Sequence, residues 1–188
     1  MKTIGLKIKS GFAIAAVLTE EADRTALDLV RTVRLSSESL PESRFPYHPT
    51  IEMSEREGAA TSRRAVEEVR RVAAREMRQL LKDVKDVERA ALVVGSTIDP
   101  GKLGNPHVRV HALEGKLFRE VVTEALAKKG VDCAVLVERS AYETVAADVS
   151  STETRVRSDI AALGQGKVKP WRAEEKLATL AAWWRMKV

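Results

Sequence analysis

The residues of this sequence best suited to ligate a transition metal are its three histidines. His107 and His111 are four residues apart, a spacing that places two side chains on one face of a helix, and His48 lies far from both. The glutamate of an H-E-x-x-H motif is missing between the pair, and no cysteine lies close in sequence. We attribute the spacing to chance, so the sequence predicts no metal site at the histidines.

Signatures of other catalytic sites are missing from the local sequence. Ser96 and Thr97 follow Val94-Gly95 without the glycine-rich frame and lysine of a P-loop, and we recognise no Ser-His-Asp or Cys-His arrangement. The single cysteine, Cys133, cannot form an internal disulfide, and its apolar surroundings predict an inert thiol. Such cysteine usage fits a reducing compartment, so we expect a cytoplasmic protein. No apolar run is long enough to span a membrane, and we expect no membrane partner.

Basic residues and tryptophans concentrate at the end of the chain. Residues 165–188 contain six Lys or Arg against two Glu, together with all three tryptophans. Cationic groups hold phosphates and aromatic rings stack on bases, so this segment is a candidate nucleic-acid surface. Its candidate phosphate-binding residues are Lys167, Lys169 and Arg172. The net charge of the chain, +5, permits this interpretation without demonstrating it.

Two other charged or aromatic patterns favour a structural interpretation. Over residues 54–86, nine Lys or Arg alternate with seven Asp or Glu, a pattern typical of a solvated helix with intrahelical ion pairs. In the last helix, Leu177, Leu180 and Trp184 share one face. That face is predicted to lie in the core or in a subunit interface.

The order of predicted elements indicates an α/β fold. Apolar segments at 3–9, 12–19, 26–36, 90–95 and 131–138 predict strands, and Ser10-Gly11 predicts a hairpin between the first two. Helical periodicity covers 54–86, with the regular helix expected from about Thr61, and also 113–126, 141–149, 152–163 and 171–186. Ser150 and Glu153 are spaced as a capping box. Residues 37–60 contain three prolines and predict an inserted or mobile loop. We therefore expect a single domain over residues 1–188, with a mixed five-stranded sheet flanked by helices.

Three antiparallel strands followed by alternating helix and strand resemble the ribonuclease H-like topology. Short motifs in residues 1–36 and 90–186 narrow the resemblance to the YqgF (RuvX) family of Holliday junction resolvases. These motifs are Leu92-Val93-Val94-Gly95 at a strand end, Val108–Ala112 at a helix start, Val137-Glu138-Arg139-Ser140, and the closing helix Glu175–Ala182. Residues 37–60 match no part of that family.

The resemblance implies a site in which carboxylates hold Mg²⁺ or Mn²⁺ for phosphodiester hydrolysis. The family begins with I-G-x-D-x-G, and here Lys7 stands in place of the aspartate and Lys9 in place of the last glycine. Glu138 and Glu175 supply carboxylates at the other two positions. An ammonium group cannot ligate a cation. The expected site is therefore degraded, with no metal or other cofactor; Glu138 and Glu175 would hold Mg²⁺ or Mn²⁺ only if the protein is active.

Lys7, Glu138 and Glu175 each also have a purely structural interpretation. Lys7 is a candidate nucleic-acid-binding residue, as a cation that replaces the metal and contacts phosphate. Its alternation with Leu6 and Ile8 favours instead a solvent-facing position in a strand. Glu138 could pair with the adjacent Arg139 or belong to a retained pocket, and the sequence leaves both open. Glu175 lies in the first turn of a helix, where an acidic residue suits the helix dipole.

Three hypotheses of function follow from this sequence. The leading hypothesis is a YqgF-like protein without catalytic activity, associated with nucleic acid or with an assembly. The second is an active metal-dependent nuclease whose carboxylate site is rebuilt around Asp99, with Glu52 and Asp86 as further ligands. The third is a structural or protein-interaction module, for instance a homodimer, supported by Trp183-Trp184 and the proline-rich segment.

Overall fold

The predicted hairpin at Ser10-Gly11 begins a five-stranded mixed sheet in the computed structural model, which describes residues 1–22 and 24–188. The strands lie in the order β3-β2-β1-β4-β5, where β1 to β3 are antiparallel and β4 and β5 run parallel to β1. Their bounds are β1 (Lys2–Lys9), β2 (Phe12–Glu21), β3 (Arg24–Arg34), β4 (Arg89–Val94) and β5 (Asp132–Val137). All five predicted strands are thus confirmed, as is the α/β class with its mixed sheet.

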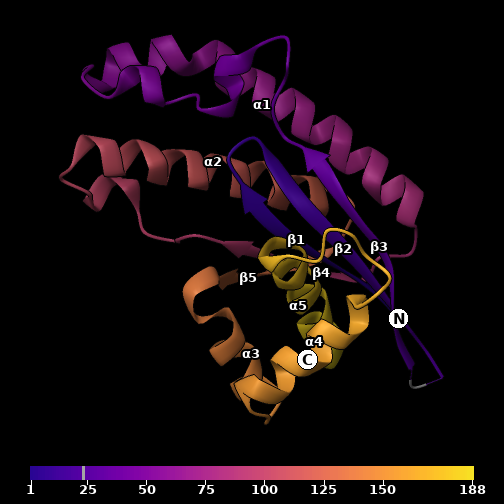
Figure 1. The fold of residues 1–188 in the computed structure, drawn as a ribbon. Helices are drawn as coiled ribbons and strands as arrows, with labels where there is room; N and C mark the ends of the chain where they lie inside the picture. The colour runs from indigo at the N-terminus through magenta and orange to yellow at the C-terminus, as the bar shows by residue number, and fades with distance from the viewer. Residues whose placement is uncertain (23) are drawn as a thin grey trace.

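Helices cover both faces of this sheet (Figure 1). One face packs against α1 (Glu55–Val84) and α2 (Pro106–Ala127). The other packs against α3 (Ala141–Asp148), α4 (Glu153–Gly164) and α5 (Ala173–Lys187). Four short 3₁₀ helices lie in the connections: η1 (Pro41–Arg44), η2 (His48–Thr50), η3 (Pro100–Lys102) and η4 (Glu138–Ser140). Among the described residues, no helix combines the length and apolar character needed to cross a membrane.

Strand β1 is buried on both faces, because α5 lies directly over one face and the other packs in the core beneath α1 and α2. A side chain at Gly5 would place its Cβ 1.8 Å from the carbonyl oxygen of Ala178, so glycine is needed for this close approach. Beside it, the Thr3 hydroxyl donates a hydrogen bond of 2.8 Å to the Ala182 carbonyl. Lys7 shares this face through the two-residue period of the strand and is only 1% exposed. The prediction that Lys7 faces solvent is therefore wrong.

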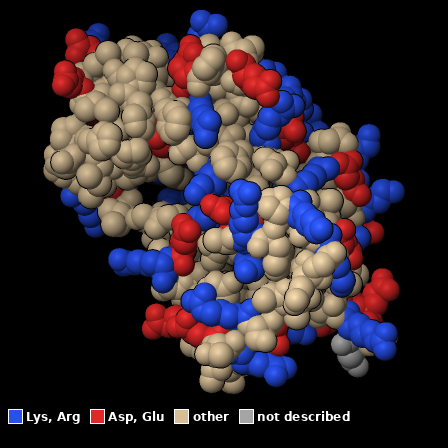
Figure 2. Space-filling model, in the orientation of Figure 1, with Lys and Arg blue, Asp and Glu red and all other residues tan. Residues whose placement is uncertain are grey.

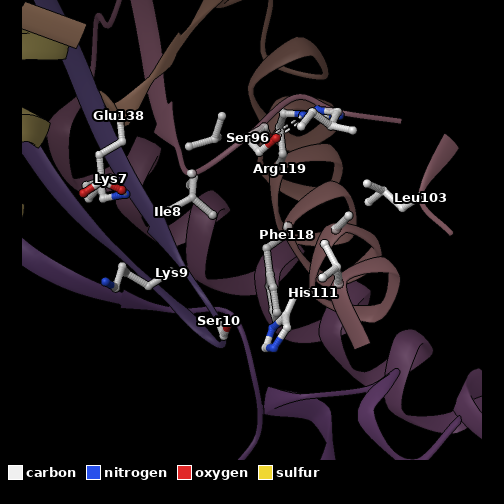
Figure 3. A pocket seen from close by; sticks show the side chains of 16 residues that line it. Lys7, Ile8, Lys9, Ser10, Ser96, Leu103, His111, Phe118, Arg119 and Glu138 are labelled. Atoms are coloured by element: carbon white, nitrogen blue, oxygen red, sulfur yellow. Dashed lines mark hydrogen bonds and ion pairs between the residues drawn. The ribbon is translucent and has the colours of Figure 1, made fainter. Parts of the chain in front are cut away.

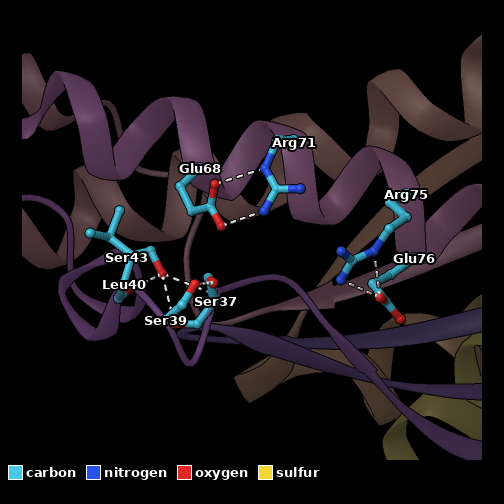
Figure 4. Close-up of polar contacts among 8 residues, drawn as sticks. All are labelled: Ser37, Ser39, Leu40, Ser43, Glu68, Arg71, Arg75 and Glu76. Atoms are coloured by element: carbon cyan, nitrogen blue, oxygen red, sulfur yellow. Dashed lines mark hydrogen bonds and ion pairs between the residues drawn. The ribbon is translucent and has the colours of Figure 1, made fainter.

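The proline-rich segment before α1 is shorter than predicted. Helix α1 begins at Glu55 rather than near Thr61, because Ser54 and Glu57 form a capping box. Gly58 does not delay the helix; it is buried where Thr50 of η2 packs against α1. Residues 55–60 of the predicted loop are thus helical. The segment before them contains η1 and η2 and lies beside α1, as Figure 4 shows for Ser43 and its neighbours.

Three other helix starts differ from the predicted ones. Helix α2 begins at Pro106, seven residues before the predicted Leu113, because the Asn105 side chain caps it and Pro106 occupies its first position. Thr152, not Ser150, accepts the capping hydrogen bond from Arg155 N at the start of α4. Ser150 instead has φ of 52° in the turn that precedes the helix. Helix α5 begins at Ala173, two residues later than predicted.

Candidate functional site

The carboxyl ends of β1, β4 and β5 meet at one edge of the sheet and border a cavity of about 430 Å³. Its walls include Lys7 and Lys9 of β1, Gly95 after β4, and Glu138 after β5. Helix α2 closes the opposite side with residues such as Arg119 (Figure 3). Parallel strands bring their carboxyl ends to a common edge, so residues far apart in sequence meet here.

Lys7 and Glu138 form an ion pair in the wall of this cavity. The Lys7 Nζ atom lies 2.6 Å from Glu138 Oε2. The lysine side chain is 2% exposed, whereas 44% of the glutamate side chain remains exposed. A buried ammonium group is costly without a partner, and Glu138 provides that partner (Figure 3). Glu138 is thus held by Lys7, while the solvent-facing side of its carboxylate remains open.

The first turn of α5 lies beside the same end of β1. Lys9 Nζ is 3.6 Å from Glu174 Oε1, which joins the strand to this turn. Glu175 is buried, and its Oε2 accepts a hydrogen bond of 2.8 Å from the backbone N–H of Arg172. Its carboxylate therefore satisfies an unpaired N–H group at the start of the helix. Glu175 is not among the residues that line the cavity.

The acidic residues proposed for a rebuilt nuclease site do not line this cavity. Asp99 accepts a hydrogen bond from Gly101 N at 3.0 Å, which caps η3. Asp86 precedes β4 and borders a separate cavity beside Lys82 and Lys129, at the other end of the sheet. Glu52 is exposed in the turn before α1. These positions do not favour a carboxylate site shared with Glu138.

The residues at this edge of the sheet do not fit a Mg²⁺ or Mn²⁺ ion. Mg²⁺ requires oxygen ligands in octahedral geometry, and here the ammonium group of Lys7 already occupies the side of Glu138 that faces the strand. Lys9 and Arg119 add two further cationic side chains to the wall. This charge favours an anion such as a phosphate group over a metal cation.

The basic residues predicted to bind nucleic acid lie close to α5. Lys167, Lys169 and Arg172 are exposed in the loop between α4 and α5. Figure 2 shows Lys and Arg side chains in a band across the middle of the face drawn there, with acidic side chains interspersed. Arg172 directly precedes the turn of α5 that pairs with Lys9. The loop thus extends from the edge of the sheet that carries the cavity.

The tryptophans are partly buried in helix packing. Trp171 packs against Gly164 at the end of α4 and donates a hydrogen bond of 3.2 Å to the Ala161 carbonyl. Trp184 donates one of 2.9 Å to Asp148 at the end of α3. Both rings belong to the cluster that joins α3, α4 and α5, so they are poorly placed to stack on bases.

The thiol of Cys133 is a weak nucleophile in this environment. Burial, with a smaller contribution from neighbouring Asp132, raises the pKa of Cys133 to about 12. The thiol is therefore protonated at neutral pH, and the thiolate is the reactive form.

The structure brings together all three histidines, which the sequence did not connect. His107 and His111 lie in the first turns of α2, and His48 in η2 packs beside them, with ring centroids 4.7 Å apart for His48 and His111. One nitrogen of each ring lies within 4.8 Å of the others. No local signal in the sequence relates His48 to the pair on α2, because the tertiary fold alone places η2 beside that helix.

Comparisons with other proteins identify the fold but not a close relative. The sequence matches no family model and no curated protein. The structure is similar to Thermus thermophilus RuvC, with 13% identity and a TM-score of 0.61 over 99% of this chain and 93% of that one. The chain has the fold of RuvC. Two further structures share it. For T. thermophilus RuvC in complex with a Holliday junction substrate, identity is 12% and the TM-score 0.59, covering 99% and 92% of the chains. For the yeast mitochondrial Holliday junction resolvase Ydc2, identity is 7% and the TM-score is 0.55, over 98% of this chain and 77% of that one.

These similarities confirm the ribonuclease H-like fold class and correct one prediction. The expectation of no metal cofactor is wrong, because the chain shares its fold with resolvases and gathers three potential metal ligands. Phosphodiester hydrolysis commonly depends on bound metal ions. Among the described residues, the potential metal ligands that lie together are the three histidines and not the carboxylates at the positions implied by the YqgF resemblance.

Proposed function

We propose that this protein binds branched nucleic acid and does not cleave it at the Lys7–Glu138 site. The ion pair between buried Lys7 and partly exposed Glu138 carries this proposal. A nuclease site at this edge of the sheet would need converging carboxylates around a cation, and Lys7 supplies a fixed positive charge instead. The YqgF resemblance assigns the first metal-binding aspartate to the Lys7 position, which agrees with the loss of cleavage there.

The charge around the cavity supports a phosphate ligand. Lys7 and Lys9 are partly neutralised by Glu138 and Glu174. Within the part of the chain that the structure describes, Arg119 bonds only to a backbone carbonyl, that of Ser96 at 3.4 Å. The exposed basic residues of the α4–α5 loop extend this positive region beyond the cavity. A strand of nucleic acid could therefore contact the cavity with one phosphate and the loop with others.

The similarity to solved resolvases supports a branched ligand. One of those structures contains a Holliday junction, and its fold matches 99% of this chain. We therefore propose a four-way junction as the preferred ligand, with duplex and single-stranded nucleic acid as weaker competitors.

Fluorescence anisotropy with labelled oligonucleotides tests binding. We expect tighter binding to a four-way junction than to duplex of the same sequence, with affinity falling steeply as salt increases. Arg119→Ala should weaken binding to the junction, and Arg78→Ala, an arginine of α1 away from this cavity, serves as the control. Equal affinity for all substrates, or no binding at low salt, would contradict the proposal.

Cleavage assays on the same substrates test the second part of the proposal. Incubation with Mg²⁺ or Mn²⁺ should leave the junction intact. Robust cleavage that is lost in a folded Glu138→Gln variant would overturn the proposal. Light scattering of the free and bound protein gives the stoichiometry and distinguishes a monomeric binder from a dimer.

A variant that adds a potential metal ligand at position 7 tests whether Lys7 prevents Mg²⁺ from binding. Lys7→Asp places a carboxylate beside Glu138, so calorimetry should detect Mg²⁺ binding that the wild-type protein lacks. Lys7→Met removes the ammonium group without adding a ligand and is the matched control. Equal Mg²⁺ binding by wild type and Lys7→Asp would show that Lys7 does not prevent a metal from binding there.

A further inference from the structure

The histidine cluster has the geometry of a transition-metal site. His107 Nε2 lies 3.1 Å from His111 Nε2, one helical turn further along α2. Two imidazole nitrogens bound to one tetrahedral Zn²⁺ are about 3.3 Å apart, given Zn–N distances of about 2.0–2.1 Å. The two histidines of α2 are thus already separated as ligands of one ion. His48 from η2 completes the group, with its ligand nitrogen within 4.8 Å of theirs.

A buried carboxylate bonds to one of these imidazole rings and lies near a second. Glu114 lies one turn beyond His111 on α2, and its side chain is 1% exposed. Its Oε1 lies 2.8 Å from Nδ1 of His48, and its Oε2 lies 4.0 Å from Nδ1 of His111. A carboxylate that accepts a hydrogen bond from Nδ1–H fixes the tautomer in which Nε2 is free to bind a metal.

The Oε2 atom of Glu114 is an independent sign that the cluster serves a ligand. It is buried and has no hydrogen-bond partner among the described residues. Unpaired buried carboxylate oxygens are costly, so such an atom needs an explanation. A small rotation of the His111 ring toward a shared ion would bring its Nδ1–H to Oε2 and satisfy it. The same movement would complete the carboxylate–histidine–metal arrangement on both sides of Glu114.

We propose that His48, His107 and His111 bind one divalent transition-metal ion, best matched by Zn²⁺, with Glu114 as a positioning residue. Three neutral imidazoles favour Zn²⁺ over Mg²⁺, which prefers oxygen ligands. His107 and His111 are exposed, so the fourth position of a tetrahedral ion would face solvent and take a water molecule.

The ion would have a structural consequence for the segment before α1. Residue His48 belongs to η2, so coordination would link this segment to the first turns of α2. His111 also lines the cavity beside Lys7, so the link would fix one wall of the proposed nucleic-acid site. The metal site does not depend on the proposed function, because zinc binding and junction binding are measured separately.

Zinc competition against a chromophoric chelator, with untagged protein, tests the site. We expect one Zn²⁺ per chain with a dissociation constant in the micromolar range or tighter. All three histidines of the chain belong to the cluster, so no other imidazole can contribute. His107→Ala and His111→Ala alter exposed side chains and should each lower the affinity by at least about 100-fold. Unchanged affinity in both folded variants, or no binding by wild type at tens of micromolar zinc, would overturn the proposal.

To test Glu114 as a positioning residue, zinc affinity and folding of the protein are measured separately. Glu114→Gln should weaken zinc binding by about 10–100-fold while circular dichroism shows a folded protein. Glu124→Gln, on the exposed side of the same helix, is the matched control and should leave zinc affinity unchanged. Co²⁺ substituted for Zn²⁺ should give the intense visible absorption of a tetrahedral site in wild type. A weak octahedral spectrum would contradict the three-histidine geometry, and zinc affinity equal to wild type in Glu114→Gln would contradict the positioning role.

Discussion

Lys7 and His111 line the same cavity, but the groups around them are organised in opposite ways. The ammonium group of Lys7 lies 2.6 Å from a carboxylate oxygen of Glu138, so the two charges satisfy each other. Around His111, a buried carboxylate faces imidazole rings, and one of its oxygens has no partner among the described residues. The carboxylate of Glu138 thus has a cationic partner without a metal ion, whereas the proposed metal ion would give the unpaired oxygen of Glu114 a partner through His111. The two regions can be separated experimentally, since a change in one leaves the contacts of the other intact.

The largest effect is expected from Gly5→Ala, which disturbs the packing that buries Lys7. The new Cβ would lie 1.8 Å from a backbone oxygen of α5, which cannot move without displacing the helix from the sheet. We expect a loss of about 3 kcal/mol in the free energy of unfolding, measured by urea denaturation. Gly95→Ala, where no atom lies within 4 Å of the added Cβ, should change stability by less than about 0.5 kcal/mol. Equal stability of the two variants would show that α5 does not pack this tightly on β1.

The next largest effect distinguishes the two members of the Lys7–Glu138 pair. Glu138→Ala leaves the ammonium group of Lys7 buried without a carboxylate, which should cost about 1–3 kcal/mol, reduced by the exposure of Glu138. Lys7→Met leaves Glu138 free to turn to solvent and should cost less than about 1 kcal/mol. The double variant should be nearly as stable as Lys7→Met, because the unpaired charge is then removed. A larger loss for Lys7→Met than for Glu138→Ala would contradict this account of the pair.

A third prediction compares the cavity with the exposed loop as contributors to nucleic-acid binding. Replacement of Lys167, Lys169 and Arg172 together by alanine should reduce the slope of log affinity against log salt by roughly two to three, at about 0.9 per phosphate contact on duplex DNA. The side chains are exposed, so the thermal unfolding midpoint should not change. Arg119→Ala should reduce the slope by about one. An unchanged slope in the triple variant would exclude the loop from the binding surface.

The smallest effect concerns the ion pair between Glu68 and Arg71 on α1, which serves as a reference for the Lys7–Glu138 pair. Two hydrogen bonds from Arg71, at 2.8 and 2.6 Å, hold the pKa of Glu68 at about 2, below its usual 4.5 (Figure 4). Because the folded-state pKa is lowered, the pair stabilises the protein above about pH 4.5, and this contribution is lost as the pH falls toward 2. Glu68→Gln should therefore lower stability slightly at pH 7 and flatten its dependence on pH between 5 and 3, measured by thermal denaturation. An identical pH dependence in the variant and the wild type would contradict the shift.

Predictions from the sequence succeeded for elements defined by local pattern. The five strands and the hairpin at Ser10-Gly11 follow from short apolar segments and turn residues, which depend on neighbours in the chain. Helix boundaries were less accurate where two local signals competed, as at Ser54 and Gly58, where the capping box prevailed. Glu138 was correctly placed at the end of the last strand, but the sequence left open whether it pairs with Arg139 or belongs to a retained pocket. Only the tertiary structure shows that Glu138 pairs with Lys7.

The sequence by itself determined the α/β class, the order of strands and helices, and the cationic character of the position on β1 that carries Lys7. These follow from period, turn chemistry and residue type, each of which is contained within a few neighbouring residues. Tertiary structure alone decided that Lys7 is buried, because burial depends on α5, which forms more than 160 residues later in the chain. It also decided that His48 joins His107, His111 and Glu114. Metal ligands need proximity in space, and two elements separated by the whole of α1 can be brought together only by the packing that folds them.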